Sequence, residues 1–127
     1  MRVLYVDDDR VNSLLFLEAC RLAPQVEVET AGTGEEALAV VESFKPDLLV
    51  IDLHLPDITG DRLLPRLRAA LQRPTLPAVL CTADAEMQVG SAARDAGFFA
   101  CWTKPVNLGM LLSELARLSA LDPSTRP

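Results

Sequence analysis

The sequence lacks long apolar runs and has little positive charge. Half of its 127 residues are hydrophobic, yet no run approaches the ~20 apolar residues that a membrane-spanning helix needs. The 18 Asp and Glu outnumber the 12 Lys and Arg and leave a formal charge of −6, which has the wrong sign for gripping a polyanion. The sequence therefore argues against a membrane protein and against direct nucleic-acid binding.

Cysteine is also scarce, and its pattern excludes a disulfide framework or a cysteine-based metal site. The three cysteines, Cys20, Cys81 and Cys101, are odd in number and lack metal-ligand spacing. We expect them to be reduced and buried, as in a cytoplasmic protein. The apolar stretch at residues 3–6 ends in acids and is too short for a signal-peptide core. No export signal is therefore expected.

Five short apolar runs are present, each followed by a stretch with helical periodicity. The predicted strands are residues 3–6, 26–30, 48–51, 78–81 and 98–102. Because these runs are continuously apolar and do not alternate, they indicate a parallel sheet covered by helices on both faces. A chain of this length has enough surface to bury for one core. The predicted fold is a single doubly wound α/β domain.

The predicted helices are recognised from apolar residues at helical spacing. The first three carry Leu14, Leu15, Leu17 and Leu22; Ala37, Leu38, Val41 and Phe44; and Leu63, Leu64, Leu67 and Leu71. Two more are expected near residues 85–96 and 106–118.

Several residues mark the ends of these helices. Thr33 and Glu36 have the spacing of a capping box, and Pro46 stops the helix that they begin. Pro65 lies inside the third predicted helix, so that helix either starts late or bends there. The predicted domain covers residues 1–119, and residues 120–127 have the composition of a flexible tail or linker stub.

Carboxylates follow two of the predicted strands. Asp7, Asp8 and Asp9 follow the first, and Asp52 follows the third. If the strand order is 2-1-3-4-5, Asp7, Asp8 and Asp52 converge in the crevice where that order reverses. Their mutual repulsion then favours a bound cation, and hard oxygen ligands in an open site suit Mg²⁺. Asp9 is better interpreted as an N-cap of the next helix.

Two other strand ends carry polar groups suited to the same crevice. Thr82 follows the fourth strand and Lys104 closely follows the fifth. A hydroxyl and an ammonium beside a carboxylate cluster could together hold a phosphoryl group on one of the acids. Each residue alone is a weak signal, because a single Thr or Lys at a strand end commonly faces solvent or caps a helix.

Taken together, these motifs resemble the receiver domains of bacterial two-component response regulators over residues 1–119. The resemblance is carried by the segments 6–9, 52–60, 82–84 and 104–105, in that order. It implies a flavodoxin-like three-layer sandwich of five β/α units with strand order 2-1-3-4-5. It further implies that Asp52 is the phosphoacceptor, that Thr82 and Lys104 contact the phosphoryl group, and that Mg²⁺ is held by Asp7, Asp8, Asp52 and the backbone carbonyl of His54.

The resemblance also implies partners. The phosphoryl donor is expected to be a histidine kinase or a histidine phosphotransfer domain, docking beside the first helix near Asn12, Leu15 and Phe16, although Leu15 and Phe16 could equally be core. Such domains catalyse only their own phosphorylation and dephosphorylation. They then act through a changed surface around the fourth helix, fifth strand and fifth helix on a downstream protein or a fused output domain.

Further details follow from the same resemblance. The His54 side chain is expected to face solvent, and residues 54 and 84 are expected to tune dephosphorylation. The small Ala83 is expected to leave the phosphate accessible. The Lys104–Pro105 peptide bond resembles the family's cis peptide.

At one position the sequence departs from the family. Three residues before the lysine, receivers usually have Tyr or Phe, whereas this chain has Cys101. Trp102 is adjacent, but strand alternation places it on the opposite face, and Phe99 shares the face of Cys101 two residues upstream. We hypothesise that phosphorylation proceeds normally while the usual aromatic readout is blunted or replaced. The alternative is that Cys101 only fills space.

Parts of these motifs also occur in proteins with other functions. Residues 7–11 also fit the nucleophile loop of haloacid-dehalogenase-like phosphatases, with Asp7 as nucleophile. That family needs further acids on a strand after the lysine, whereas residues 106–118 predict only a helix, and Asp52 would have no role. A dinucleotide-binding fold would need a glycine-rich turn where these acids stand. A binding module that no longer uses phosphate remains as a third alternative, because of Cys101.

Overall fold

The computed structural model describes residues 1–83, 92–104, 109–110, 113–114 and 116–117. Its centre is a parallel sheet of five strands in the order β2-β1-β3-β4-β5, which confirms the predicted order. The strands are β1 (Arg2–Val6), β2 (Glu27–Ala31), β3 (Leu48–Asp52), β4 (Ala78–Thr82) and β5 (Ala100–Thr103). Four of them lie within about one residue of the predicted runs, and β5 starts later than predicted.

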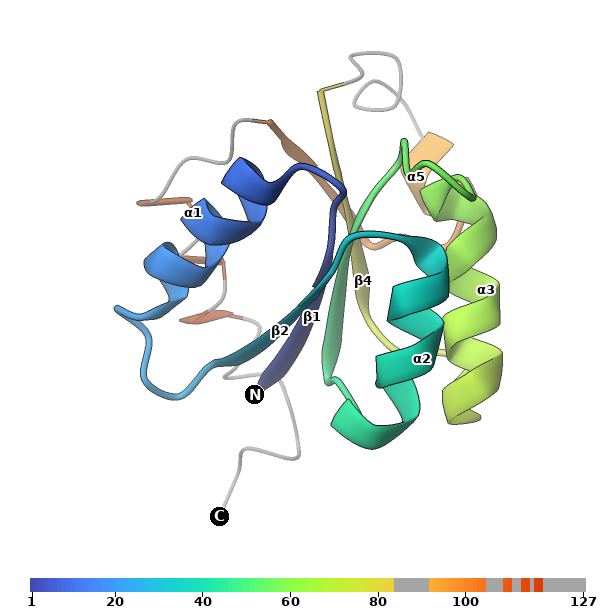
Figure 1. Ribbon diagram of the computed structural model, residues 1–127, viewed down its shortest axis with the longest axis horizontal. Coiled ribbons are helices and arrows are strands. Elements are labelled where there is room, and N and C mark those ends of the chain that lie inside the picture. The colour runs from blue at the N-terminus through green and yellow to red at the C-terminus, as the bar shows by residue number, and fades with distance from the viewer. Residues whose placement is uncertain (84–91, 105–108, 111–112, 115, 118–127) are drawn as a thin grey trace.

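Helices cover both faces of this sheet, as Figure 1 shows. The described helices are α1 (Arg10–Cys20), α2 (Gly34–Phe44), α3 (Gly60–Leu71) and α5 (Ala92–Asp95). Helix α1 lies on one face, whereas α2 and α3 lie side by side on the other. The predicted three-layer α/β sandwich is therefore confirmed. Much of the two last predicted helices falls outside the described residues.

The sheet separates two apolar cores because successive side chains of a strand point to opposite faces. On the α2 and α3 side, Leu4, Leu49 and Leu80 pack against helix residues such as Leu63 and Leu67. On the α1 side, the core residues are Val3, Tyr5, Phe16, Ala19, Cys20, Leu48, Val50, Val79, Cys81 and Trp102. Strands buried on both faces explain the continuous apolar runs in the sequence.

The N-terminal ends of α1 and α2 are capped by the side chains that the sequence predicted. The Thr33 hydroxyl accepts a hydrogen bond from the Glu36 amide at 3.0 Å, and the Glu36 carboxylate accepts one from the Gly32 amide at 2.8 Å. Asp9 caps α1, because its carboxylate accepts from the amides of Val11 and Asn12 at 2.9 and 3.3 Å. Both caps satisfy backbone N–H groups that have no partner within the helix.

Helix α3 runs through its proline. It begins at Gly60 and continues past Pro65 to Leu71, so the alternative of a late start is wrong. Proline inside a helix costs about 3 kcal/mol. The fully buried Leu63, Leu64 and Leu67 anchor α3 on the sheet, and the burial of each leucine contributes roughly 2 kcal/mol, which outweighs that cost.

Three expectations about burial are corrected by the structure. Leu14 and Leu15, two of the apolar residues that marked the first predicted helix, are 62% and 60% exposed, and Leu22 lies beyond the end of α1 at Cys20 and is 67% exposed. The face of α1 that packs on the sheet is instead made by Phe16, Ala19 and Cys20. The sequence was misleading here because several overlapping apolar faces can be drawn on one leucine-rich helix.

The second correction concerns the cysteines. Cys20 and Cys81 are buried, as expected, but Cys101 is only partly buried.

The third correction concerns the residues before β5. Phe98 is 1% exposed and packs in the core on the α2 and α3 side, whereas Phe99 is 39% exposed. Phe99 precedes the strand, so strand alternation does not place it on the face of Cys101.

Some predictions fall outside the described residues. These are the tail at 120–127, the role of Asp84 and the Lys104–Pro105 peptide bond.

Across the described part of the chain, no helix combines the length and the apolar character that crossing a membrane requires.

Candidate functional site

The register of the sheet brings the polar strand ends to one edge. Val6 pairs with Ile51, so the next residues, Asp7 and Asp52, follow at the same level of neighbouring strands. Asp7 follows Val3 and Tyr5 at intervals of two, and these residues face α1. By the same alternation Asp52 and Lys104 continue the α1-facing rows of β3 and β5. Three charged side chains from three strands therefore point to the same side of one edge.

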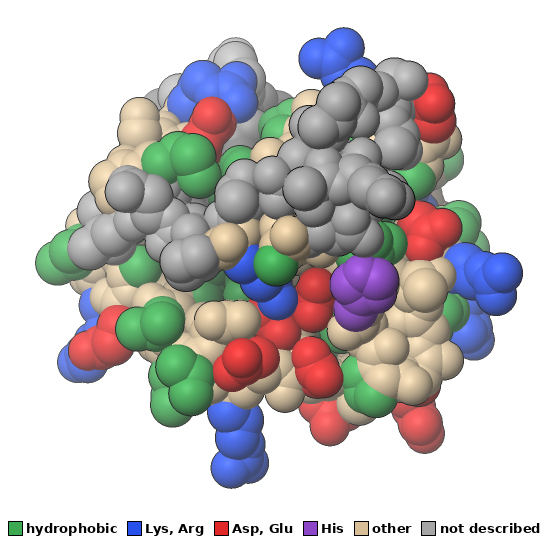
Figure 2. Space-filling view, turned by 90° about the horizontal axis from the view of Figure 1, so that it is seen from above, with side chains coloured by type: hydrophobic (Ala, Val, Ile, Leu, Met, Phe, Trp, Pro, Cys, Tyr) green, Lys and Arg blue, Asp and Glu red, His purple; other side chains and the backbone are tan. Residues whose placement is uncertain are grey.

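These side chains line an open hollow of about 580 Å³ at the carboxyl edge of the sheet. Figure 2 shows red acidic side chains around a blue basic one, with the purple histidine at the rim. The lining residues are Asp7, Asp8, Asp9, Asn12, Asp52, His54, Thr82, Ala83 and Lys104. Every residue that the sequence assigned to the phosphoryl and metal sites is among them.

The carboxylates of Asp7, Asp8 and Asp52 converge as predicted. Each offers one oxygen, and these oxygens lie within 4.8 Å of one another. Asp7 and Asp52 are 2% and 7% exposed, whereas Asp8 is exposed. A few hard oxygen donors beside open space for water match the preference of Mg²⁺, which keeps several waters when it binds protein. The donor set therefore fits this ion.

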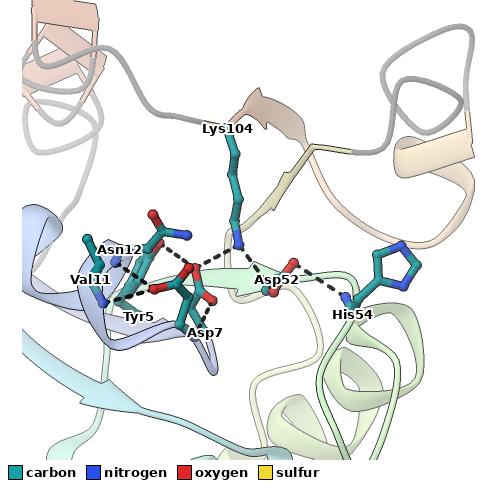
Figure 3. Close-up of polar contacts among 8 residues, drawn as sticks. Tyr5, Asp7, Val11, Asn12, Asp52, His54 and Lys104 are labelled. Atoms are coloured by element: carbon teal, nitrogen blue, oxygen red, sulfur yellow. Dashed lines mark hydrogen bonds and ion pairs between the residues drawn. The ribbon is translucent and has the colours of Figure 1, made fainter.

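Lys104 places a positive charge between the two buried acids, as Figure 3 shows. Its Nζ lies 2.7 Å from Asp7 Oδ2 and 3.2 Å from Asp52 Oδ2. Burial alone acts to lower the pKa of Lys104, but Asp7 and Asp52 outweigh burial and raise it. Lys104 therefore stays protonated and offsets part of the repulsion between the carboxylates.

Asp52 is a buried carboxylate that is incompletely compensated. Burial raises the pKa of Asp52, Lys104 acts to lower it, and Asp7 acts to raise it. Oδ1 accepts a hydrogen bond from the His54 amide at 3.3 Å, and Oδ2 faces Lys104. Both oxygens thus have defined directions, and the carboxylate opens onto the hollow.

Asp7 is fixed more tightly, through two contacts that sequence reasoning missed. Its Oδ2 accepts a hydrogen bond from the Tyr5 hydroxyl at 2.9 Å, and its Oδ1 accepts one from the Asp9 amide at 3.0 Å. Tyr5 stacks on Phe16 of α1 with ring centroids 4.2 Å apart. The period of two on a strand was a usable signal for Tyr5, since it places residues 5 and 7 on the same face.

Other predicted site residues lie where the sequence placed them. The His54 side chain is exposed and its ring points away from Asp52 (Figure 3). Thr82 is 1% exposed, Ala83 is exposed, and both line the hollow. For His54, the backbone amide contacts Asp52, whereas the role of its carbonyl as a metal ligand stays a prediction.

The three candidates for donor docking lie on α1 and differ in how exposed their side chains are. Phe16 is 3% exposed and belongs to the core, so its place in a docking surface was wrong and the core alternative is correct. Leu15 is 60% exposed and follows Asn12 by about one helical turn, and Asn12 lines the hollow itself. Asn12 and Leu15 therefore remain available to a partner.

Cys101 and Trp102 lie on opposite faces of β5, as strand alternation predicted. Cys101 packs against the core on the α2 and α3 side, and Trp102 belongs to the core on the α1 side. Trp102 therefore does not replace an aromatic residue at position 101.

Comparison with known proteins agrees with this geometry. The family model of the response regulator receiver domain matches residues 3–116. The chain is 33% identical to a region of the virulence sensor protein BvgS of Bordetella bronchiseptica and 33% identical to a region of the transcriptional regulatory protein TcrA of Mycobacterium tuberculosis. Both matches cover 100% of this chain but only 11% and 49% of those relatives.

Solved structures show the same fold. A CheY-like receiver domain protein from Methanospirillum hungatei superposes with a TM-score of 0.83 at 29% identity, covering 98% of each chain. The chemotaxis response regulator CheY4 of Vibrio cholerae superposes with a TM-score of 0.81 at 28% identity, covering 92% of this chain and 97% of that one. None of these matches supports the phosphatase alternative with Asp7 as nucleophile. The chain belongs to the response regulator receiver domain family.

Proposed function

We propose that this receiver domain accepts a phosphoryl group on Asp52 and converts it into a changed protein-interaction surface. The observation that carries the proposal is the position of Asp52: its carboxylate opens into a hollow beside Asp7, Asp8 and Lys104, with the three acids within 4.8 Å. Acceptance of phosphorus at this point needs positioning and charge neutralisation more than covalent machinery.

In the proposed transfer, an Asp52 oxygen attacks phosphorus as the bond from phosphorus to the donor histidine nitrogen breaks in line. Lys104, already 3.2 Å from Asp52 Oδ2, pairs with the phosphoryl oxygens, and Thr82 donates its hydroxyl to one of them. Asp7, Asp8, Asp52 and the His54 carbonyl are the proposed Mg²⁺ ligands. The ion would neutralise charge that gathers on the transferred group.

The domain is proposed to catalyse only its own phosphorylation and the later hydrolysis, in which water attacks the phosphorus of phospho-Asp52. His54 and Ala83 stand at the rim of the hollow, where water approaches. Ala83 is small and leaves that approach open.

The proposed donor is a histidine kinase or a histidine phosphotransfer domain. Among the relatives, RcsC of Salmonella typhimurium is named a sensor histidine kinase and BvgS a sensor protein, which supports a kinase as partner. We place its contact on the exposed side of α1, at Asn12 and Leu15. The protein is proposed to act in the cytoplasm on a downstream protein or a fused output domain.

Incubation with Mg²⁺ and acetyl phosphate, followed by intact-protein mass spectrometry, tests the proposal. We expect one phosphoryl adduct that is lost in Asp52→Asn and when EDTA replaces the metal. Asp8→Asn serves as the matched variant, because it removes an exposed carboxylate from the metal cluster and should slow labelling without changing its site. An unlabelled protein under these conditions would instead favour a phosphate-independent binding module.

A further inference from the structure

The loop after the proposed phosphoacceptor is tied to the start of α2. Asp57 lies in this loop between β3 and α3, and its two carboxylate oxygens accept hydrogen bonds from the amides of Gly34 and Glu35, each at 2.9 Å. These amides belong to the first turn of α2, where backbone N–H groups have no partner within the helix. A contact over 22 and 23 residues of sequence thus joins two separate elements.

A second contact lies beside the first. A Cβ atom at position 34 would stand 2.4 Å from the Ile58 side chain and 3.4 Å from the Asp57 carboxylate oxygens. Glycine is therefore the residue that lets the start of α2 approach the loop this closely. Polar and apolar contacts together fix the tip of the loop against α2.

The base of the same loop is fixed against Asp52. The Gly60 amide donates to the Leu53 carbonyl at 2.8 Å, and residues His54 and Thr59 form an antiparallel bridge. Between these contacts the His54 amide donates to Asp52 Oδ1 at 3.3 Å. The loop is therefore held at both ends, by its own base and by the Asp57 contact with α2.

We propose that Asp57 is a positioning residue for Asp52: by holding the tip of the 53–59 loop on α2, it keeps the backbone of His54 in place against the phosphoacceptor. This inference rests on the proposed function. A carboxylate suits the task because each of its two oxygens accepts from one amide, whereas an asparagine side chain would turn its NH₂ donor toward one of these N–H groups. The two amides hold the pKa of Asp57 below its usual value, so the carboxylate is charged at neutral pH.

An experiment can distinguish this positioning role of Asp57 from a role in which Asp57 only stabilises α2. The same helix end has a second cap, in which Thr33 accepts from the Glu36 amide at 3.0 Å. Thr33 is the N-cap residue directly before α2, whereas Asp57 reaches the same helix end from the loop between β3 and α3. Thr33→Ala is therefore a matched control: it removes a cap from the same helix and leaves the loop contact in place.

The experiment uses the ¹⁵N-labelled chain in three variants, Asp57→Ala, Asp57→Asn and Thr33→Ala, beside the wild type. Amide hydrogen exchange in the metal-free protein reports on the loop, and amide shifts during a Mg²⁺ titration give the dissociation constant. In Asp57→Ala we expect hydrogen exchange of the His54 and Gly60 amides to become about tenfold faster. We also expect Mg²⁺ binding to weaken about tenfold, which is the smallest effect typical of residues that orient metal ligands without binding the metal. Asp57→Asn should fall between Asp57→Ala and the wild type.

Thr33→Ala should accelerate exchange only in the first turn of α2 and leave Mg²⁺ affinity unchanged. The inference is overturned if Thr33→Ala and Asp57→Ala affect the loop and the metal equally, or if neither affects them. Failure of the wild type to bind Mg²⁺ counts against the proposed function instead, and exchange at His54 and Gly60 still decides whether Asp57 positions the loop.

Discussion

Lys104 lies closer to Asp7 than to the proposed phosphoacceptor. Its Nζ is 2.7 Å from Asp7 Oδ2 and 3.2 Å from Asp52 Oδ2. In the absence of metal, Lys104 therefore serves both acids as a counter-ion. A group added to Asp52 would give Lys104 a new anionic partner, so the side chain that balances the resting site also takes part in the proposed transfer.

Removing this cation should destabilise the metal-free protein. Lys104→Met leaves Asp7 and Asp52 buried without their shared partner, and we expect a loss of about 3 kcal/mol in the free energy of unfolding. Arg21→Met is the control, since the Arg21–Glu18 pair is exposed and should contribute little to stability. Urea unfolding with and without Mg²⁺ measures both. Because Mg²⁺ also neutralises the acids, it should restore part of the loss, and an equal loss under both conditions would argue against this role.

The stability of the protein should depend on the ionisation of Asp52. Burial raises the pKa of Asp52 above the ordinary value of 3.8. The ionised form is therefore disfavoured in the fold, and this cost is present at neutral pH and disappears as the pH falls through the raised pKa. Asp52→Asn should therefore stabilise the metal-free protein at neutral pH, and Lys104 keeps Asp7 as its partner at 2.7 Å in this variant.

The test is urea unfolding of wild type and Asp52→Asn in EDTA over a series of pH values. The stability difference should shrink steadily toward acid pH. A difference that stays constant, or one that grows toward acid pH, would show that the carboxylate is fully compensated in the fold.

Gly60 is expected to tolerate no side chain. A Cβ atom there would stand 2.5 Å from the backbone oxygen of Asp52 and 3.0 Å from Ile51. Gly60→Ala should cost about 2–3 kcal/mol, since backbone atoms must shift, and it should disturb Asp52 directly. Gly32→Ala is the comparison, because its nearest contact would be an ordinary 3.5 Å to Glu36. Thermal unfolding of both variants checks this, and equal effects would contradict it.

A substitution at Cys101 should change the conformational response to phosphorylation without changing the rate of phosphorylation. The side chain packs on the α2 and α3 side of β5 and is not in the hollow, so Cys101→Tyr should leave the rate of labelling by acetyl phosphate unchanged. The larger side chain should enlarge the amide shift changes in residues 99–104 that accompany phosphorylation. If neither the rate nor the shifts respond, Cys101 only fills space.

The sequence predicted the parts of the site that depend on short-range pattern. Apolar runs located the strands, and acids directly after them located Asp7, Asp8 and Asp52 at one edge. Strand alternation placed Cys101 and Trp102 on opposite faces. These inferences succeed because a parallel sheet brings its carboxyl ends together whatever the details of its loops.

The remaining features depend on contacts between distant segments. Nothing in the residues near Asp57 indicates that its partners are the amides of Gly34 and Glu35, because backbone amides are the same at every position. Whether Leu15 and Phe16 belong to the core or to a docking surface stayed open in the sequence, because helical spacing does not say which apolar face of α1 meets the sheet. Adjacent aromatic residues, Phe98 and Phe99, likewise hid the true start of β5.

Trapping the acyl phosphate is the sharpest test of Asp52 as the phosphoacceptor. Protein treated with Mg²⁺ and acetyl phosphate is reduced with borohydride, which converts a phosphorylated aspartate to homoserine, and the peptides are then sequenced by mass spectrometry. We expect homoserine at position 52 and at no other aspartate. Homoserine at position 7 in place of 52, or no homoserine at all, would contradict it.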